Sequence, residues 1–175
     1  MDTKHITKTD IDAMLFAVSA HSKQKYGEYP YSVHLGFVNY YVNKYKHLLS
    51  NQIDVDIATQ SGWLHDIIED CPAINYEILK SEFGERIANT VRILTNVNGV
   101  YNLEKLKGDK VAFFVKLCDR LANVSFLTNI NFIEKTYDKY VSQSEDMFNN
   151  CPNEFKEMID EMKSMFNNKT KLKKQ

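Results

Sequence analysis

The sequence predicts an all-α fold in a single domain. Apolar residues recur mostly at three- and four-residue spacing, which is the period of one face of a helix. Only 6 glycines and 3 prolines are spread along the 175 residues, and no Ser/Pro/Gly-rich linker or internal repeat divides them. This length fits one domain, and a hydrophobic content of 43% is enough for a sizeable core. We place the domain at residues 1–168 and a basic, flexible tail at 169–175.

The first half of the chain is predicted to form three helices before residue 70. Thr9 and Asp12 have the spacing of a capping box, and the helix that follows has its apolar face at Ile11, Leu15 and Val18. A second helix is predicted over 32–49, with apolar positions at Val33, Phe37, Tyr40, Tyr41 and Leu48. A third is predicted over about 54–66.

The second half continues the helical pattern. Gly84 is predicted to end one helix, and the next has its apolar positions at Ile87, Val91 and Leu94. A long helix over about 106–127 has a broad apolar stripe formed by Val111, Phe114, Val115, Cys118, Leu121 and Ala122. Two more helices are expected over about 132–148 and, with Pro152 near its first turn, about 152–166.

Charge and cysteine usage exclude several classes of protein. The formal net charge is −1 from 22 basic and 23 acidic residues, so we expect neither nucleic acid nor an anionic membrane as partner. The 3 cysteines lack any CxxC spacing, which argues against a disulfide framework or a zinc knuckle. The N-terminus has no apolar signal core, and no apolar run approaches the roughly 20 residues that span a bilayer. We therefore expect a cytoplasmic protein, and the sequence makes no prediction of its oligomeric state.

The segment "GWLHDIIEDC" (62–71) concentrates ionisable side chains at the end of an apolar helix. Buried charges need a counter-charge, so His65, Asp66, Glu69 and Asp70 must either reach solvent or share a partner such as a metal ion. One imidazole and one carboxylate at His65 and Asp66 suit Mn²⁺, Fe²⁺, Zn²⁺ or Mg²⁺. The alternative is a helix cap with a solvated neighbour.

Two residues elsewhere are candidates for further ligands. His34 lies near the start of an apolar-striped helix, and Asp119 lies on a helix otherwise devoted to the core. Lys116, Arg120 and Asn123 lie at i−3, i+1 and i+4 from Asp119 and share one polar edge with it, which could hold both a metal and an anion. Each candidate also has a structural interpretation, as a core histidine or as a surface ion pair.

The order of these motifs resembles a known family. "YPYSVH" with His34, "GWLHDIIEDC" with His65 and Asp66, and "VKLCDRLANV" with Asp119 follow the H…HD…D pattern of the HD-domain metal-dependent phosphohydrolases. More narrowly, they resemble "G-x-PY-x-x-H-P", "LLHD-x-x-ED" and "KLADRLHN" of the (p)ppGpp hydrolase domain of RelA/SpoT proteins and of stand-alone small alarmone hydrolases. The resemblance spans about residues 16–126 and implies an HD-domain helical bundle. The chain departs from the family at Leu35, where proline is usual, and at Ala122, where histidine or tyrosine is usual.

The resemblance implies a role for each motif residue. His34, His65, Asp66 and Asp119 would bind one divalent ion, with Mn²⁺ as the family's metal. Glu69 and Asp70 would be the catalytic pair, and Lys25, Arg120 and Asn123 would contact the substrate. Lys116 offers a further positive charge to a phosphate, while Tyr31, Tyr137 and Tyr140 are candidates for stacking on a nucleobase. Of the remaining histidines, only His21 is near enough in the pattern to support the site indirectly.

The implied reaction is hydrolysis of the 3′-pyrophosphate of ppGpp or pppGpp, giving GDP or GTP and pyrophosphate. A metal lowers the pKa of bound water, and a neighbouring carboxylate can accept the proton. Three alternatives remain open at this stage. Another HD-domain nucleotide phosphohydrolase, such as a 5′-nucleotidase or a cyclic-nucleotide phosphodiesterase, would share the metal ligands; a nucleotide-sensing module would have lost catalysis; and a structural helical protein would leave the charge cluster unexplained.

Overall fold

The predicted all-α architecture is confirmed by the computed structural model, which describes residues 9–97, 99–129 and 134–172. The first helices along the chain are α1 (Asp10–Ala20), α2 (Ser32–Tyr45), α3 (Gln52–Leu64), α4 (Ile67–Asp70), α5 (Tyr76–Phe83) and α6 (Glu85–Leu94). They are followed by α7 (Leu103–Lys107), α8 (Lys110–Asn129), α9 (Glu134–Asn150) and α10 (Lys156–Leu172), with 3₁₀ turns η1 (Lys46–Leu48) and η2 (Asn153–Phe155). A short antiparallel hairpin, β1 (Lys25–Tyr26) and β2 (Tyr29–Pro30), joins α1 to α2. In the part of the chain that the structure describes, no helix is long and apolar enough to cross a bilayer.

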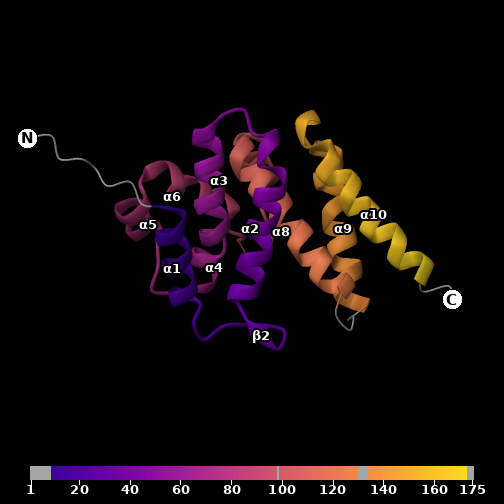
Figure 1. The fold of residues 1–175 in the computed structure, drawn as a ribbon, viewed down its shortest axis with the longest axis horizontal. Coiled ribbons are helices and arrows are strands. Elements are labelled where there is room, and N and C mark those ends of the chain that lie inside the picture. The colour runs from indigo at the N-terminus through magenta and orange to yellow at the C-terminus, as the bar shows by residue number, and fades with distance from the viewer. Residues whose placement is uncertain (1–8, 98, 130–133, 173–175) are drawn as a thin grey trace, which may run out of the picture.

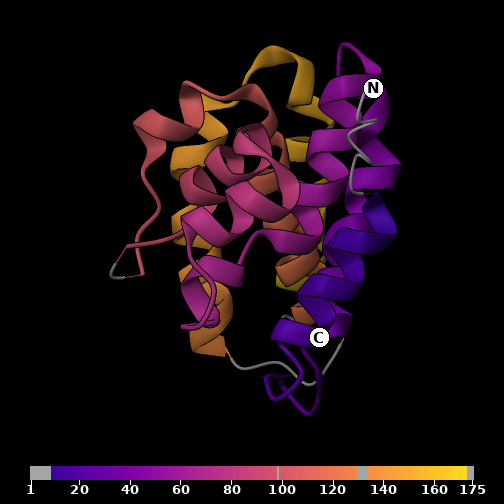
Figure 2. The same ribbon diagram turned by 90° about the vertical axis from the view of Figure 1, so that its left-hand side faces the viewer.

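Helix α8 lies at the centre of the bundle, between two groups of helices (Figures 1 and 2). It packs against α2, α3 and α6 on one side and against α9 and α10 on the other. Every residue of its predicted apolar stripe is buried. The predicted 106–127 helix is divided, however, because α7 ends before Gly108 and α8 begins at Lys110.

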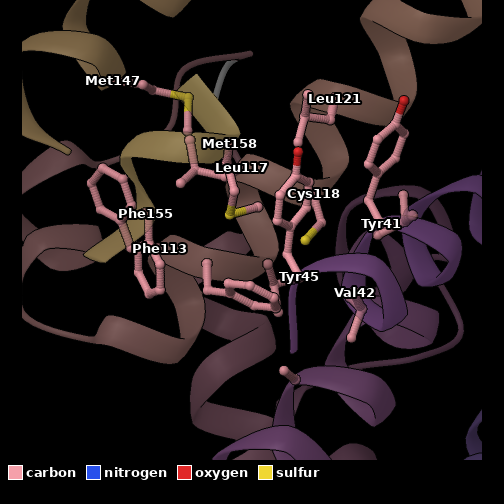
Figure 3. Packing of buried hydrophobic residues seen from close by; sticks show 14 of the residues in the cluster. Tyr41, Val42, Tyr45, Phe113, Leu117, Cys118, Leu121, Met147, Phe155 and Met158 are labelled. Atoms are coloured by element: carbon pink, nitrogen blue, oxygen red, sulfur yellow. The ribbon is translucent and has the colours of Figure 1, made fainter. Parts of the chain in front are cut away.

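Two hydrophobic clusters form the core. The larger one joins α2 and α8 to α9, η2 and α10, with Tyr41, Val42 and Tyr45 facing Phe113, Leu117, Cys118, Leu121, Met147, Phe155 and Met158 (Figure 3). The smaller one joins α1, α2, α3, α4, α5 and α6 around Leu35, Leu64, Ile67 and Leu79. The candidate site lies where α2, α3, α4 and α8 meet, so both clusters fix its geometry.

The predicted apolar face of α1 is wrong. Ile11 and Leu15 are 63% and 59% exposed, Val18 is also exposed, and the buried residues are Ala13 and Ala17. Alanine has no side chain beyond Cβ, so this face allows α1 to pack closely against α3. Tyr40, another predicted core position, is likewise exposed on α2.

Other boundaries differ by a few residues. Gly84 ends α5 as predicted, with a positive φ of 85°. The third helix ends at Leu64 rather than near Asp66, and α10 runs to Leu172, into the segment predicted as a flexible tail. The start of the helix predicted over 132–148 falls partly outside the described residues, and α9 begins at Glu134.

Asp109 anchors the start of α8 and gives a pH-dependent contribution to stability. Its Oδ1 accepts hydrogen bonds from the backbone N–H groups of Val111 (3.1 Å) and Ala112 (3.0 Å), and its carboxylate pairs with Arg86. Burial would raise the pKa of Asp109, but Arg86 and the helix amides outweigh burial and lower it. A carboxyl whose folded pKa is lowered stabilises the fold above its unfolded pKa and loses that effect as the pH falls through the folded pKa.

We therefore expect Asp109→Asn to lower the free energy of unfolding by about 1 kcal/mol at neutral pH, because half-exposed Arg86 is partly screened by solvent. The difference should shrink as the pH falls below about 4, the usual pKa of an aspartate, and should be lost once the pH passes the lowered pKa of folded Asp109. Urea denaturation at neutral and acidic pH measures both values. Asp160→Asn, at an exposed position of α10, is the control; a difference independent of pH would contradict the assigned cause.

Candidate active site

The four predicted metal ligands come together from four elements. His34 lies on α2, His65 follows α3, Asp66 precedes α4, and Asp119 lies on α8. The Nε2 atoms of His34 and His65 are 3.2 Å apart, and Asp66 Oδ2 lies 2.9 Å from His65 Nε2 and 3.6 Å from His34 Nε2. Asp119 Oδ1 lies 3.5 Å from His34 Nε2 and 3.8 Å from His65 Nε2. Two imidazoles and two carboxylates therefore converge on one point.

Neighbouring groups hold three of these ligands in place. His65 Nδ1 lies 2.9 Å from the carbonyl oxygen of Gly62, an acceptor, so Nδ1 carries the proton and Nε2 is left to face the cluster. The Tyr31 hydroxyl donates a hydrogen bond to Asp66 Oδ2. Lys116 Nζ lies 3.0 Å from Asp119 Oδ2, and Asn123 Nδ2 donates to Asp119 Oδ1 at 2.6 Å. Such outer contacts are typical of metal ligands, whose orientation they fix.

The cluster shifts the pKa values of its own members. Burial would lower the pKa of His65, but the carboxylates of Asp66 and Asp119 outweigh burial and raise it to about 9. Burial would raise the pKa of Asp66, but His65 and His34 hold it below its usual value. Lys116 and His65 lower the pKa of Asp119 against the same effect of burial. The site thus concentrates negative charge and attracts a cation, either a proton or a metal ion.

The donor set fits a divalent metal. Ligand atoms of His34, His65 and Asp66 all lie within 4.8 Å of one another. His34 and His65 are 2% and 1% exposed, so a bound ion would be shielded by protein on that side. Imidazole nitrogen combined with carboxylate oxygen suits Mn²⁺, Fe²⁺ or Zn²⁺. Asp119 lies next to these residues, within 4 Å of both histidine Nε2 atoms, and is the fourth candidate ligand.

A cavity of about 330 Å³ opens beside this cluster and contains both predicted catalytic carboxylates. Glu69 accepts hydrogen bonds from the Asn96 backbone N–H (2.9 Å) and from Asn96 Nδ2. Asp70 Oδ2 accepts one from Gln24 Nε2 at 2.7 Å. Both carboxylates therefore lie at the cavity in orientations set by segments remote in the sequence.

Two buried cations line the same cavity. Lys116 and Arg120 are each 4% exposed, and the Arg120 guanidinium lies over the Tyr140 ring at 4.7 Å. Burial and the Asp119 carboxylate raise the pKa of Tyr140 to about 12, so its hydroxyl stays protonated. A phosphate in this cavity would have these two cations among its neighbours, together with the carboxylates that line it.

The three other predicted substrate contacts, Asn123, Lys25 and Tyr137, differ in their position relative to the cavity. Asn123 lines the cavity, but its amide is already bonded, since Oδ1 accepts from the hydroxyls of Tyr26 (2.8 Å) and Tyr140 (3.1 Å) while Nδ2 donates to Asp119. Lys25 is exposed on β1 and is not among the described residues that line the cavity. Tyr137 belongs to α9, and its side chain falls outside the described part of the structure.

Sequence reasoning missed Gln24, Asn96 and Tyr26 as parts of the site. Asn96 lies in the loop after α6 and meets Glu69 only through the packing of α6 against α4. Tyr26 lies on the hairpin and reaches across to Asn123 on α8. Neither residue has a local motif around it, so only the fold shows these contacts.

The chain was compared with known proteins both by sequence and by structure, and only the structural comparison found a similar protein. No family model and no curated protein matches the chain by sequence. A solved structure described as a metazoan ortholog of SpoT, which hydrolyses ppGpp and plays a role in starvation responses, is similar over 95% of this chain and 98% of its own, with a TM-score of 0.73 and 17% identity. The chain has the same fold as this SpoT ortholog. The fold implied by the sequence motifs is therefore confirmed.

Gly62 on α3 lies in close contact with α2, the helix that carries His34. A Cβ at Gly62 would lie 3.2 Å from Asn39 Oδ1 and 3.2 Å from Val42 Cγ2, both on α2. Gly36 on α2 is a matched control, because a Cβ there would meet nothing within 4 Å. We expect Gly62→Val to lower the free energy of unfolding by about 1–3 kcal/mol and to weaken metal binding, because it separates His34 from His65.

Gly36→Val should leave both properties close to wild type, since it adds the same atoms where there is room. Urea denaturation and calorimetric titration with Mn²⁺ measure the two effects. Equal results for the two variants would show that close approach at Gly62 does not control the site.

Proposed function

We propose that the protein is a metal-dependent phosphohydrolase that removes the 3′-pyrophosphate of ppGpp or pppGpp. The products are GDP or GTP and pyrophosphate. The observation that carries this proposal is the cavity in which Glu69 and Asp70 lie with Lys116 and Arg120 beside the His/Asp cluster. The ppGpp hydrolysis reported for the structurally similar SpoT ortholog supports the choice of substrate.

The proposed metal is one Mn²⁺, held by His34, His65, Asp66 and Asp119. When bound, such an ion supplies a Lewis acid for a phosphate oxygen and lowers the pKa of a water ligand. Lys116 keeps Asp119 oriented and adds positive charge near the phosphate. Arg120 presents a planar guanidinium, which suits bidentate contact with phosphate oxygens.

The carboxylate pair would move the protons of the reaction. Water attacks the phosphorus attached to the 3′ oxygen, the P–O3′ bond breaks, and the nucleoside oxygen leaves. One carboxylate accepts the proton lost by the water, and a proton must reach the departing oxygen. Glu69 and Asp70 are adjacent and both line the cavity, so we assign these two tasks to the pair.

Product analysis by chromatography tests the proposal. Purified protein is incubated with ppGpp and Mn²⁺, and a chelator-treated sample is the control. We expect GDP and pyrophosphate with metal and intact ppGpp without it. Orthophosphate or a linearised cyclic nucleotide from other substrates would instead indicate a 5′-nucleotidase or a cyclic-nucleotide phosphodiesterase. Bound Mn²⁺ with no turnover of any nucleotide would indicate a sensing module.

A further inference from the structure

A chain of side chains outside the catalytic pair connects α1 to Asp70. His21 ends α1, and Gln24 lies in the turn that leads to the hairpin. The Gln24 backbone is fixed on both sides, because its N–H donates to His21 O at 2.9 Å and its carbonyl accepts from Tyr31 N–H at 3.1 Å. Its side chain therefore starts from a fixed point and extends towards the cavity.

The hydrogen bonds of Gln24 determine its orientation. The amide lies between Asp70 Oδ2, 2.7 Å from Nε2, and His21 Nδ1, 2.7 Å from Oε1. An ionised carboxylate only accepts, so the NH₂ group must face Asp70 and the oxygen must face His21. His21 Nδ1 must then carry the proton.

The surroundings of His21 agree with that tautomer. His21 is 3% exposed, and its Nε2 is buried without a hydrogen-bond partner among the described residues. An unpaired buried lone pair is tolerated better than an unpaired buried N–H, so the bare nitrogen is the one expected at this position. The ring stacks on Tyr31 at 4.7 Å, and Tyr31 donates to the metal-ligand candidate Asp66. His21 thus contacts both Tyr31, which donates to Asp66, and Gln24, which donates to Asp70.

We propose that Gln24, oriented by His21, is a positioning residue that fixes the Asp70 carboxylate for the reaction. This inference rests on the proposed function of the site. Asp70 is exposed, and without a donor its carboxylate would be free to change rotamer. A displacement of about 1 Å at a reacting group can lower a rate about a hundredfold, so a single hydrogen bond here can have a large effect.

The test is a double-mutant cycle between Gln24 and Asp70. Gln24→Leu removes both hydrogen bonds while keeping a similar volume, and Gln24→Met is a second replacement in case leucine disturbs folding. We expect kcat for ppGpp to fall about ten- to a hundredfold with little change in KM, in Mn²⁺ affinity or in Tm. In an Asp70→Asn background the same change should cause no further loss.

Gln52→Leu is the matched control, because Gln52 donates a similar 2.7 Å hydrogen bond to Asp56 on α3, remote from the cavity. It should keep wild-type kcat. A loss from Gln24→Leu that is undiminished in the Asp70→Asn background, or no loss at all, would overturn the inference.

Nitrogen NMR of His21 separates this inference from the proposed function. The wild type should show His21 protonated on Nδ1 in the metal-loaded protein, and Gln24→Leu should remove that preference. If the wild type does not cleave ppGpp, the proposed function fails, and the tautomer then shows separately whether His21 orients Gln24 towards Asp70. A wild-type His21 protonated on Nε2 would overturn it even in an active enzyme.

Discussion

Asp66→Asn is expected to abolish stoichiometric Mn²⁺ binding and to lower ppGpp hydrolysis about a thousandfold, since a catalytic metal contributes several kcal/mol to the transition state. The substitution keeps the shape of the side chain and an oxygen that can accept the Tyr31 hydrogen bond. It removes the negative charge that lies 2.9 Å from His65 Nε2. A loss of Mn²⁺ binding and of activity would therefore be due to the missing charge of Asp66 and to the weaker metal binding of an amide oxygen.

Two opposing effects follow from that lost charge. Asp66 helps to raise the pKa of His65 to about 9, so its removal makes His65 easier to deprotonate and reduces competition between proton and metal. It also removes one of two carboxylates from the donor set. The second effect should dominate, because a neutral amide oxygen is a much weaker ligand than a carboxylate for a borderline divalent ion.

Asp160→Asn on α10 is the control for Asp66→Asn and should retain both metal and activity. Calorimetric titration with Mn²⁺ and chromatography of the products give the two readouts. Unchanged Mn²⁺ affinity in Asp66→Asn would mean that the cluster is a buried His–Asp network that stabilises the fold, which is the structural interpretation of these residues.

The central part of the site was predictable because it is local in the sequence. His65, Asp66, Glu69 and Asp70 lie within one segment, and charges at the end of an apolar helix must either reach solvent, as Glu69 and Asp70 do, or share a partner. His34 and Asp119 were ambiguous by themselves and gained meaning only from their resemblance to a family pattern. The structure places His34 Nε2 3.6 Å from Asp66 Oδ2, and Asp119 Oδ1 within 4 Å of both imidazoles, so the four candidate ligands lie together.

The supports of the site were not predictable in the same way. Gln24 and Asn96 are ordinary polar residues outside the helices. Each bonds a carboxylate that is distant in the sequence, and only the packing of the helices brings the two together.

The error in the predicted apolar face of α1 also comes from packing between helices. A periodic pattern gives weight to large residues such as Ile11 and Leu15, whereas the close packing of α1 on α3 selects the small side chains of Ala13 and Ala17. The stripe of α8 was predicted correctly because that helix is covered on several sides.

Glu69→Gln is expected to separate catalysis from metal binding. Mn²⁺ affinity should stay at the wild-type level, while hydrolysis should fall about a hundredfold to ten-thousandfold, the usual contribution of a general acid or base. Glutamine has nearly the same size but cannot accept a proton in the pH range of the reaction. Its NH₂ group cannot accept from Asn96 as the oxygen that it replaces does, so glutamine keeps at most part of the hydrogen bonding of Glu69.

Glu77→Gln on α5 provides the matched control, because Glu77 is exposed and lies outside the described lining of the cavity. Loss of Mn²⁺ together with activity in Glu69→Gln would make Glu69 a metal ligand and move the proton transfer to Asp70. Wild-type rates would mean that Asn96 holds a solvated carboxylate with no part in the chemistry. Retained metal with lost turnover would distinguish a hydrolase from a nucleotide sensor, because a sensor needs the ligands and the cations of the cavity but has no use for a proton acceptor beside them.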